Sequence, residues 1–435
     1  MSLALEQNLE SSHVMHTFGR SPVEFTGGHG MVLVGDDGRE YRDFLAGIGV
    51  CCLGHGHPAV VNAVREQAEK LVHVSNYFHI EHRGEVAALL SKLANDDMEG
   101  ASKLVAAIDS GDEDAVVAAA APAEGEQVWQ AFFSNSGAEA NEGSMKLARL
   151  YAQRKGNGGN TIVALRGGFH GRTLETIAAT MQDWLQDSFK PLPGGFVACT
   201  PNDCDELRSI FEAHGDEIAA VMLEPIQGES GVHPLTQEFL ELARDLAHEH
   251  GGLLIADEVQ TGIFRSGKPF AFQTFTAGEG CENGVEPDIM SLAKGIAGGV
   301  PMGAVVAKAE VASAFKPGDH GSTFGGSNLA VAAACSVLCE LVRGRYDEHA
   351  KEIGAYLAEK LAEVPQVSGV RGAGLMRGCD IDESCGDAHD VVAKMLEAGF
   401  VINATGPHTL RFLPPLVCER EDVDDMIAAL AGVLG

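Results

Sequence analysis

No apolar run in the 435-residue sequence approaches the ~18–20 residues that a membrane-spanning helix needs. The first twenty residues lack a basic segment followed by an apolar core, so they do not resemble a secretory signal peptide. CxxC pairs are absent, and the ten cysteines are scattered through the chain, which favours reduced thiols over a disulfide framework. These absences predict a soluble, cytoplasmic protein.

Positive charge is scarce. The chain has 31 Lys and Arg against 62 Asp and Glu, a formal net charge of -31. Such a surface repels phosphate backbones and anionic lipids, so neither nucleic acid nor a membrane is an expected partner. The hydrophobic fraction of 45% and the charged fraction of 21% are ordinary for a globular protein.

Several catalytic signatures are also missing. The chain has no G-x-S-x-G elbow and no GxxxxGK[ST] loop, and the glycine-rich stretch GIAGGVPMG (295–303) does not follow the dinucleotide-binding pattern. His55 and His57 lie in the stretch GHGH, but a glycine-rich HxH is typical of a turn. No metal site is therefore predicted.

The chain does contain short apolar runs that alternate with amphipathic helical segments such as 236–251. The strand-like runs are 128–134, 161–165, 218–224, 252–258 and 287–293. Apolar strands with crossover helices predict an α/β fold, with a mostly parallel central sheet covered on both faces.

A change of pattern near residue 330, to two long helices, short strands and a closing helix at 421–434, predicts a smaller α+β domain. We expect a large domain over 61–325 and a small domain over 326–435, with residues 1–60 packing against the small one. Segment 96–126 has nine Asp and Glu against one Lys, which indicates a solvated, partly helical surface insertion or, alternatively, a partner-binding element.

Polar residues at the carboxyl ends of parallel strands are the candidates for function, because ligands bind at that edge. Ser136 and Glu139 fit an S-x-x-E capping box at the start of a helix. Gly137 and the first-turn N–H groups would equally suit a phosphate, although Glu139 would repel one. Both interpretations stay open on this stretch alone.

Asp257 lies at the end of one strand-like run, and Lys294 follows another. A lysine at a strand end is either a snorkelling side chain or a group that forms a Schiff base with an aldehyde. Asp257, followed by Glu258, could bind a metal, act as a base or pair with a cationic ring nitrogen. Together with the glycine-opened helix, these residues meet the needs of pyridoxal phosphate: an imine link, a charged electron sink and a phosphate anchor.

The chain resembles the class III (ornithine/acetylornithine-type) aminotransferases of the fold-type I pyridoxal-phosphate superfamily from about residue 18 to its C-terminus. The stretches that carry the resemblance include FFSNSGAEANE, GGFHGRT, LEPIQGESGV, LLIADEVQTGIFRSG, PDIMSLAKGIAGGVPMGA, HGSTFGGSNLA and LRFLPPL. So many ordered motifs in one chain make the resemblance specific.

The resemblance implies roles at the cofactor. Lys294 would be the Schiff-base and proton-transfer lysine, and Asp257 would pair with the pyridine nitrogen. The remaining cofactor-binding residues would be Gln260 near the phenolic oxygen, Phe169 over the ring, Ser136, Gly137 and Ala138 at the phosphate, and Thr323 reaching that phosphate from a neighbouring subunit. The last role implies a homodimer with shared active sites.

The resemblance also implies substrate contacts. Arg172 would bind a carboxylate of the amino donor, and Arg411 would bind the α-carboxylate of 2-oxoglutarate or glutamate. Glu229 would be the alternating partner of Arg411, because an unpaired buried charge is costly. Two departures from the family pattern are Cys51-Cys52, where polar residues are common, and Ser327-Asn328, where Asn-Pro is common.

The expected activity is transfer of the δ-amino group of N2-acetylornithine to 2-oxoglutarate, a step of arginine biosynthesis. Ornithine, succinylornithine, succinyl-diaminopimelate and 4-aminobutyrate remain alternative donors, and an aminomutase is a further possibility on the same fold. More distant alternatives are a non-catalytic protein of this fold and a metal-dependent hydrolase that uses Asp257, Glu258 and histidines.

Overall fold

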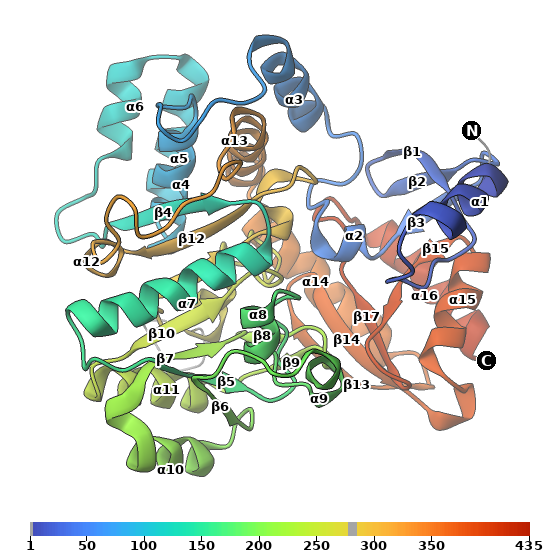
Figure 1. Ribbon diagram of the computed structural model, residues 1–435. Helices are drawn as coiled ribbons and strands as arrows, with labels where there is room; N and C mark the ends of the chain where they lie inside the picture. The colour runs from blue at the N-terminus through green and yellow to red at the C-terminus, as the bar shows by residue number, and fades with distance from the viewer. Residues whose placement is uncertain (1–2, 277–284) are drawn as a thin grey trace.

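The computed structural model describes residues 3–276 and 285–435, and a seven-stranded sheet lies at its centre (Figure 1). Its strands follow the order β4 (Trp129–Ser134), β12 (Gly303–Lys308), β11 (Ile289–Leu292), β10 (Leu253–Asp257), β7 (Ile218–Leu223), β5 (Thr161–Leu165), β6 (Phe196–Cys199). Within this sheet β12 alone runs antiparallel to its neighbours. The predicted α/β fold with a mostly parallel sheet is confirmed.

Both faces of this sheet are covered by helices, as strands without a polar face require. Every residue of β7 is buried. Val221 packs in the cluster of α10 (Cys204–His214) and α11 (Gln237–Glu249), whereas Ala220 and Met222 pack in the cluster of α7 (Gly137–Arg154). The sequence patterns located five strands of the sheet and missed β6 and β12.

The sheet topology brings the predicted site residues to one edge. Strands β4, β10 and β11 run in the same direction, because β12 between β4 and β11 is antiparallel to both. Asp257 is the last residue of β10, α7 begins three residues after β4, and Lys294 follows β11 by two residues. The carboxyl ends of these strands therefore meet where ligands bind in such sheets.

The C-terminal part contains a second sheet, of β13 (Val367–Ala373), β14 (Met376–Ile381), β17 (Thr409–Phe412) and β16 (Asn403–Ala404). Its helices are α14 (Tyr346–Ala362), α15 (Ala388–Glu397) and α16 (Arg420–Leu434), while α13 (Asn328–Arg343) packs on α3 (Pro58–Lys70).

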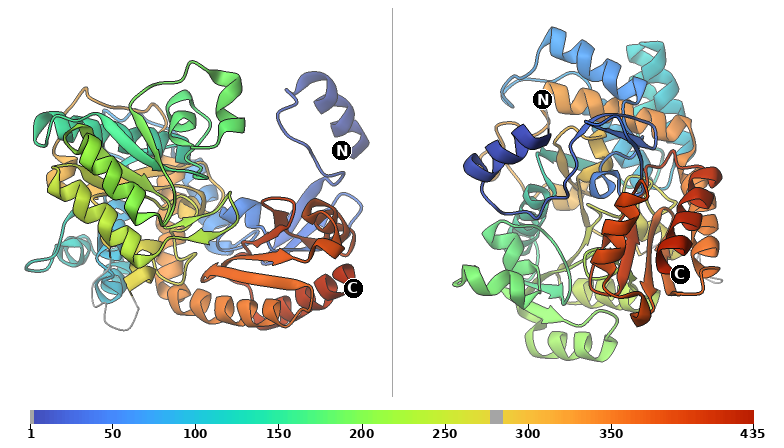
Figure 2. Two further views of the ribbon diagram at one scale, coloured as in Figure 1. Left: turned by 90° about the horizontal axis from the view of Figure 1, so that it is seen from below. Right: turned by 90° about the vertical axis from the view of Figure 1, so that its right-hand side faces the viewer.

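The N-terminal strands lie beside this C-terminal part (Figure 2). Strands β1 (Phe25–His29), β2 (Val32–Gly35) and β3 (Glu40–Asp43) form a sheet with β15 (Phe400–Val401), which pairs in parallel with β3. Arg42 adds ion pairs to Asp422 and Asp425. Helix α1 (Leu3–His13) stands off from the body and buries no residue. The domain boundaries themselves stay a prediction.

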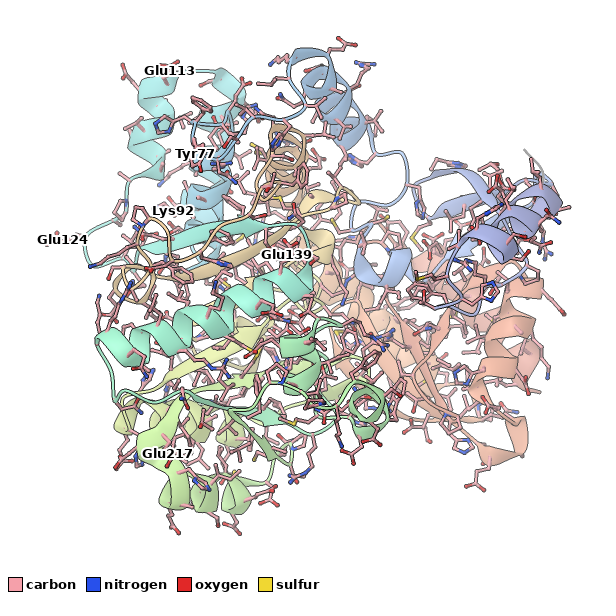
Figure 3. All side chains as sticks on the ribbon, in the orientation of Figure 1. Tyr77, Lys92, Glu113, Glu124, Glu139 and Glu217 are labelled. Carbon is pink, nitrogen blue, oxygen red and sulfur yellow. The ribbon has the colours of Figure 1, made fainter. Side chains whose placement is uncertain are left out.

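The acidic segment 96–126 forms two helices next to α4 (Arg83–Ala94). Helix α5 (Met98–Ser110) buries Leu104 and Val105 in the main core, so this half is not a solvated insertion. Helix α6 (Glu113–Ala120) buries no residue, and Glu113 and Glu124 lie at the outer edge of the molecule (Figure 3). The expectation of a solvated surface therefore fits only the outward face of α6 and the exposed residues around it, since Val116 and Ala120 pack against the core and Glu126 pairs with the buried Lys92.

The structure also bears on the expected absence of membrane-spanning helices and on the state of the cysteines. No helix in 3–276 or 285–435 has the length and apolarity needed to cross a membrane. The nine cysteines in these ranges are free thiols, and Cys281 lies outside the described residues.

Candidate active site

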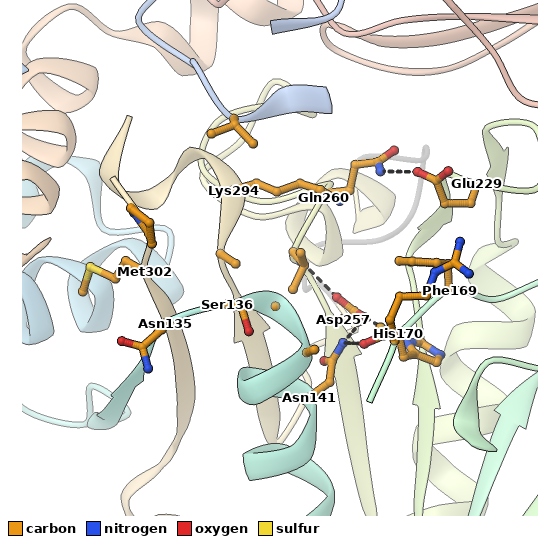
Figure 4. Close-up of a pocket in the computed structure, with 18 of the residues that line it drawn as sticks. Asn135, Ser136, Asn141, Phe169, His170, Glu229, Asp257, Gln260, Lys294 and Met302 are labelled. Atoms are coloured by element: carbon orange, nitrogen blue, oxygen red, sulfur yellow. Dashed lines mark hydrogen bonds and ion pairs between the residues drawn. The ribbon is translucent and has the colours of Figure 1, made fainter. Parts of the chain in front are cut away.

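A cavity of about 380 Å³ opens at the carboxyl edge of the central sheet (Figure 4). Its wall includes nine of the predicted site residues: Ser136, Gly137, Ala138, Phe169, Arg172, Glu229, Asp257, Gln260 and Lys294. Arg411 lies directly behind this wall, bonded to Glu229 and Gln260. Thr323 does not line it.

The carboxylate of Asp257 lies at the floor of the cavity, where three N–H groups hold it. Its Oδ2 accepts from Asn141 Nδ2 at 2.7 Å and from His170 Nδ1 at 2.8 Å, and its Oδ1 accepts from the backbone N–H of Val259 at 3.0 Å. The Asp257 side chain is 3% exposed. A buried carboxylate with three donors is a fixed anion in one orientation.

Two further titratable groups lie beside Asp257. Burial opposes protonation of His170, but the hydrogen bond and charge of Asp257 outweigh it, so the pKa of His170 is raised. Burial raises the pKa of Glu224 to about 7, although Glu224 accepts the backbone N–H groups of Phe169 and Gly228. The floor of the cavity therefore holds three titratable side chains close together: Asp257, His170 and Glu224.

Lys294 reaches into the cavity from the 3₁₀ turn that follows β11 (Figure 4). Its backbone is left-handed, with φ of 44°, a conformation that is strained for a residue with a side chain. Burial lowers the pKa of the Lys294 amine, against the attraction of Glu229 and Asp257. Within the described residues its Nζ has no hydrogen bond or ion pair, so the amine is available to react.

The start of α7 forms another wall of the cavity. Ser136 is the N-cap, and its Oγ accepts the backbone N–H of Glu139 at 3.2 Å. The Glu139 carboxylate does not close the predicted capping box, because it accepts the backbone N–H and the side-chain amide of Asn135. Within the described ranges the N–H groups of Gly137 and Ala138 have no acceptor, as expected of an anion site at a helix start.

Arg411, on β17, lies behind the part of the cavity wall that Glu229 and Gln260 form. The guanidinium donates to Glu229 Oε1 at 2.6 Å, to Gln260 Oε1 at 3.1 Å and to Asn403 Oδ1 at 2.7 Å. The Arg411 side chain is 1% exposed, whereas that of Glu229 is 32% exposed. Burial opposes ionisation of Glu229, but Arg411 outweighs it, and the pKa of Glu229 is lowered.

The predicted donor-binding residue Arg172 lies at the mouth of the cavity. Its guanidinium lies over the ring of Phe169 at 5.4 Å, and the residue is exposed. A cation that is free at the rim can meet a carboxylate at little desolvation cost.

Thr323 lies outside the cavity of its own chain. It is exposed and lines two surface hollows, next to Phe324, which is 61% exposed. Tyr77, 94% exposed, lines one of the same hollows. The expectation that Thr323 serves a neighbouring subunit is compatible with this position and stays a prediction.

Three residues around Asp257 were not predicted from the sequence: Asn141, His170 and Glu224. Asn141 lies four residues after Gly137, on the same face of α7, and this spacing was a usable signal. His170 and Glu224 lie inside the stretches GGFHGRT and LEPIQGES, but no local pattern shows that they surround Asp257. Only the folded structure shows that these two residues lie next to Asp257.

Curated relatives match almost the entire chain. It is 42% identical to the acetylornithine aminotransferase of Methanocaldococcus jannaschii over 431 residues, which cover 97% of this chain and 96% of that protein. It is 40% identical to acetylornithine aminotransferase 1 of Bordetella bronchiseptica over 428 residues, 98% of each chain.

Solved structures agree with this match. An ornithine aminotransferase from Toxoplasma gondii superposes with a TM-score of 0.82 at 28% identity, covering 100% of this chain and 94% of that one. An acetylornithine aminotransferase from Elizabethkingia anophelis gives a TM-score of 0.79 at 27% identity, with coverage of 100% and 99%. Residues 16–434 match the aminotransferase class-III family, and the chain belongs to this family.

Proposed function

We propose that this class-III aminotransferase binds pyridoxal phosphate and transfers the δ-amino group of N2-acetylornithine to 2-oxoglutarate. The products are N-acetylglutamate semialdehyde and glutamate, and the reaction belongs to arginine biosynthesis. The observation that carries the chemistry is a half-buried Lys294, whose amine has no hydrogen bond or ion pair among the described residues, in one cavity with Asp257 and with Glu229, the partner of Arg411. The names of the relatives support the donor.

Besides Lys294, the cavity fits the cofactor on two independent points. Asp257 supplies a fixed anion for a protonated ring nitrogen. The acceptor-free N–H groups of Gly137 and Ala138, with Ser136, suit a phosphate. When bound, pyridoxal phosphate supplies an aldehyde that accepts an amino group and a ring that withdraws electrons from the substrate carbon.

Lys294 has the properties of a nucleophile and proton carrier. Because burial lowers the pKa of the amine, more of it is neutral near pH 7 than for a solvated lysine. The neutral Nζ would hold the cofactor through its aldehyde, and once a substrate amine takes that place, Nζ would be the group that takes a proton from the substrate carbon.

Glu229 and Arg411 allow one cavity to accept two different substrates. While the donor is bound, Glu229 neutralises the buried Arg411. When 2-oxoglutarate binds, its carboxylate replaces Glu229 as the bidentate partner of the guanidinium. Arg172 at the rim binds the carboxylate of acetylornithine.

The proposed assembly is a homodimer in which Thr323 completes the phosphate site of the partner subunit. The exposed Phe324 and Tyr77 beside Thr323 support this, because soluble monomers rarely leave such groups together in water. Sedimentation equilibrium should return twice the chain mass, and a monomer mass for the active enzyme contradicts the assembly.

The test of the proposed function is the visible spectrum of the purified protein during single half-reactions. The yellow colour should bleach on addition of N2-acetylornithine and return on addition of 2-oxoglutarate. Ornithine and 4-aminobutyrate, added separately, should bleach it at least about tenfold more slowly.

Two variants serve as controls for this spectrum. Lys294→Ala should lose the reaction with every amine, whereas Lys155→Ala, at an exposed lysine near the end of α7, should behave as the unchanged protein. Faster bleaching with ornithine would replace the donor and keep the chemistry. A protein that stays colourless in excess pyridoxal phosphate would contradict the function as a whole.

A further inference from the structure

A second cluster of reactive side chains lies where the start of α4 meets the middle of α13. His82 is the N-cap residue of α4, Glu85 lies in its first turn, and Cys335 is a buried residue of α13. One ligand atom from each of the three lies within 4.8 Å of the other two. In the part of the chain that the structure describes, no other group of three His, Cys, Asp or Glu residues has this spacing.

The hydrogen bonds of the cluster converge on one atom. Glu85 Oε2 accepts from His82 Nδ1 at 2.5 Å and from Cys335 Sγ at 3.8 Å. His82 Nδ1, Glu85 Oε2 and Cys335 Sγ therefore lie close together, and the hydrogens of the imidazole and the thiol lie between them. A divalent cation can take the place of those two hydrogens and bind all three atoms.

The surroundings leave room for a fourth ligand. Cys339 lies one helical turn after Cys335 and lines the same cavity of about 260 Å³ as Cys335 and His82. The cations of this cavity have other carboxylates as partners: Lys70 pairs with Glu81, which also lies 3.9 Å from His82 Nε2, and Arg343 pairs with Asp109. None of the three cluster residues lines the cavity of Lys294.

We propose that His82, Glu85 and Cys335 form a binding site for one Zn²⁺ ion per chain, with Cys339 or water as the fourth ligand. An imidazole, a carboxylate and a thiolate form a mixed nitrogen, oxygen and sulfur set that Zn²⁺ accepts in tetrahedral geometry. Binding forms the Zn–S, Zn–N and Zn–O bonds, releases the thiol proton to solvent and moves the His82 Nδ1 proton to Nε2, so that Nδ1 can ligate. The bound ion links α4 to α13, two helices whose ligands are 250 residues apart.

A matched set of proteins tests the site. The tag-free holoenzyme is treated with a chelator, dialysed and titrated with Co²⁺, whose visible bands and thiolate charge-transfer band report tetrahedral sulfur ligation. Cys335→Ser and His82→Asn are the site variants. Cys204→Ser is the control, because Cys204 also lies among carboxylates, Asp203, Asp205 and Glu238, but outside the cluster.

The unchanged protein and Cys204→Ser should each bind one Co²⁺ per chain, and Zn²⁺ should displace it. Both site variants should bind Co²⁺ at least about tenfold more weakly. Zn²⁺ should also raise the melting temperature of the unchanged protein and not that of His82→Asn. Retained transaminase activity shows that each variant is folded. Equal Co²⁺ spectra and affinities in the unchanged protein and His82→Asn, or no binding to either, overturn the site.

Discussion

Asp257 and Glu258 are consecutive carboxylates at the end of the same strand, and both are buried, but their surroundings differ completely. Asp257 faces the Lys294 cavity and accepts from His170, Asn141 and the backbone of Val259. Glu258 points away from that cavity and accepts from Thr261 Oγ1 at 2.5 Å and from the backbone N–H groups of Ala271 and Phe272. Adjacent residues of a strand point to opposite faces, so one carboxylate serves the site and the other holds a loop.

The opposite orientations of Asp257 and Glu258 rule out a hydrolase metal shared by these two carboxylates. A metal bound between Asp257 and Glu258 would need both side chains on one side of β10, and they lie on opposite sides. Within the described ranges, neither residue belongs to a group with metal-ligand spacing. Replacing each carboxylate by its amide should therefore affect different properties: turnover for Asp257 and the pH dependence of stability for Glu258.

The largest difference between the Asp257 and Glu258 variants is expected in turnover. Asp257→Asn should lower kcat by about 10²- to 10³-fold, because the amide removes the fixed charge opposite the proposed ring nitrogen. Glu258→Gln should keep kcat within about threefold, since its side chain touches neither the cavity nor Lys294. Steady-state kinetics with acetylornithine and 2-oxoglutarate, on proteins with matched far-UV circular dichroism, measures both values. Similar losses in the two variants would remove the distinction.

The second difference is in the pH dependence of stability. Burial raises the pKa of Glu258 to about 7 from an ordinary value of 4.5. A carboxyl with a raised folded pKa stabilises the fold fully below its unfolded pKa, and that contribution is lost as pH rises towards and through the folded pKa. Between pH 5 and pH 8 the unchanged protein should lose about 3 kcal/mol relative to Glu258→Gln.

Urea unfolding of both proteins at pH 5 and pH 8 measures this relative loss. At pH 5 the variant should be the less stable protein, since the amide N–H₂ would face the O–H and N–H donors that the carboxyl oxygens accept. At pH 8 much of that deficit should disappear. A constant difference across this range would show that Glu258 does not change its protonation in the folded state.

The smallest effect is expected at Glu229. This carboxylate faces the cavity, as Asp257 does, but its partner Arg411 is proposed to exchange it for a substrate carboxylate. Glu229→Gln leaves the buried Arg411 without a neutralising charge while the donor is bound, and should slow the acetylornithine half-reaction about tenfold. The 2-oxoglutarate half-reaction should be unchanged or faster, because the competitor of the substrate carboxylate is gone. Stopped-flow absorbance separates the two rates, and equal slowing of both would contradict the exchange.

Much of the chemistry could be predicted from the chain itself. The apolar runs located five strands of the central sheet, and Asp257 and Lys294 stood at strand ends because the chain leaves a parallel strand at the ligand-binding edge. The resemblance of ordered motifs indicated the family, which the full-length match to class-III aminotransferases confirmed. The roles assigned to individual residues remain predictions.

The rest depended on contacts between distant segments. That His170 and Asn141 hold Asp257, and that Glu258 turns away to bind Ala271 and Phe272, follows from the packing of elements far apart in sequence. The same holds for Glu85 and Cys335, which meet only because α4 packs on α13. Local pattern determines which residue ends a strand, because the pattern reports burial. Tertiary structure decides which partner a buried charge finds, because each charge must be satisfied by whatever group the fold brings to it.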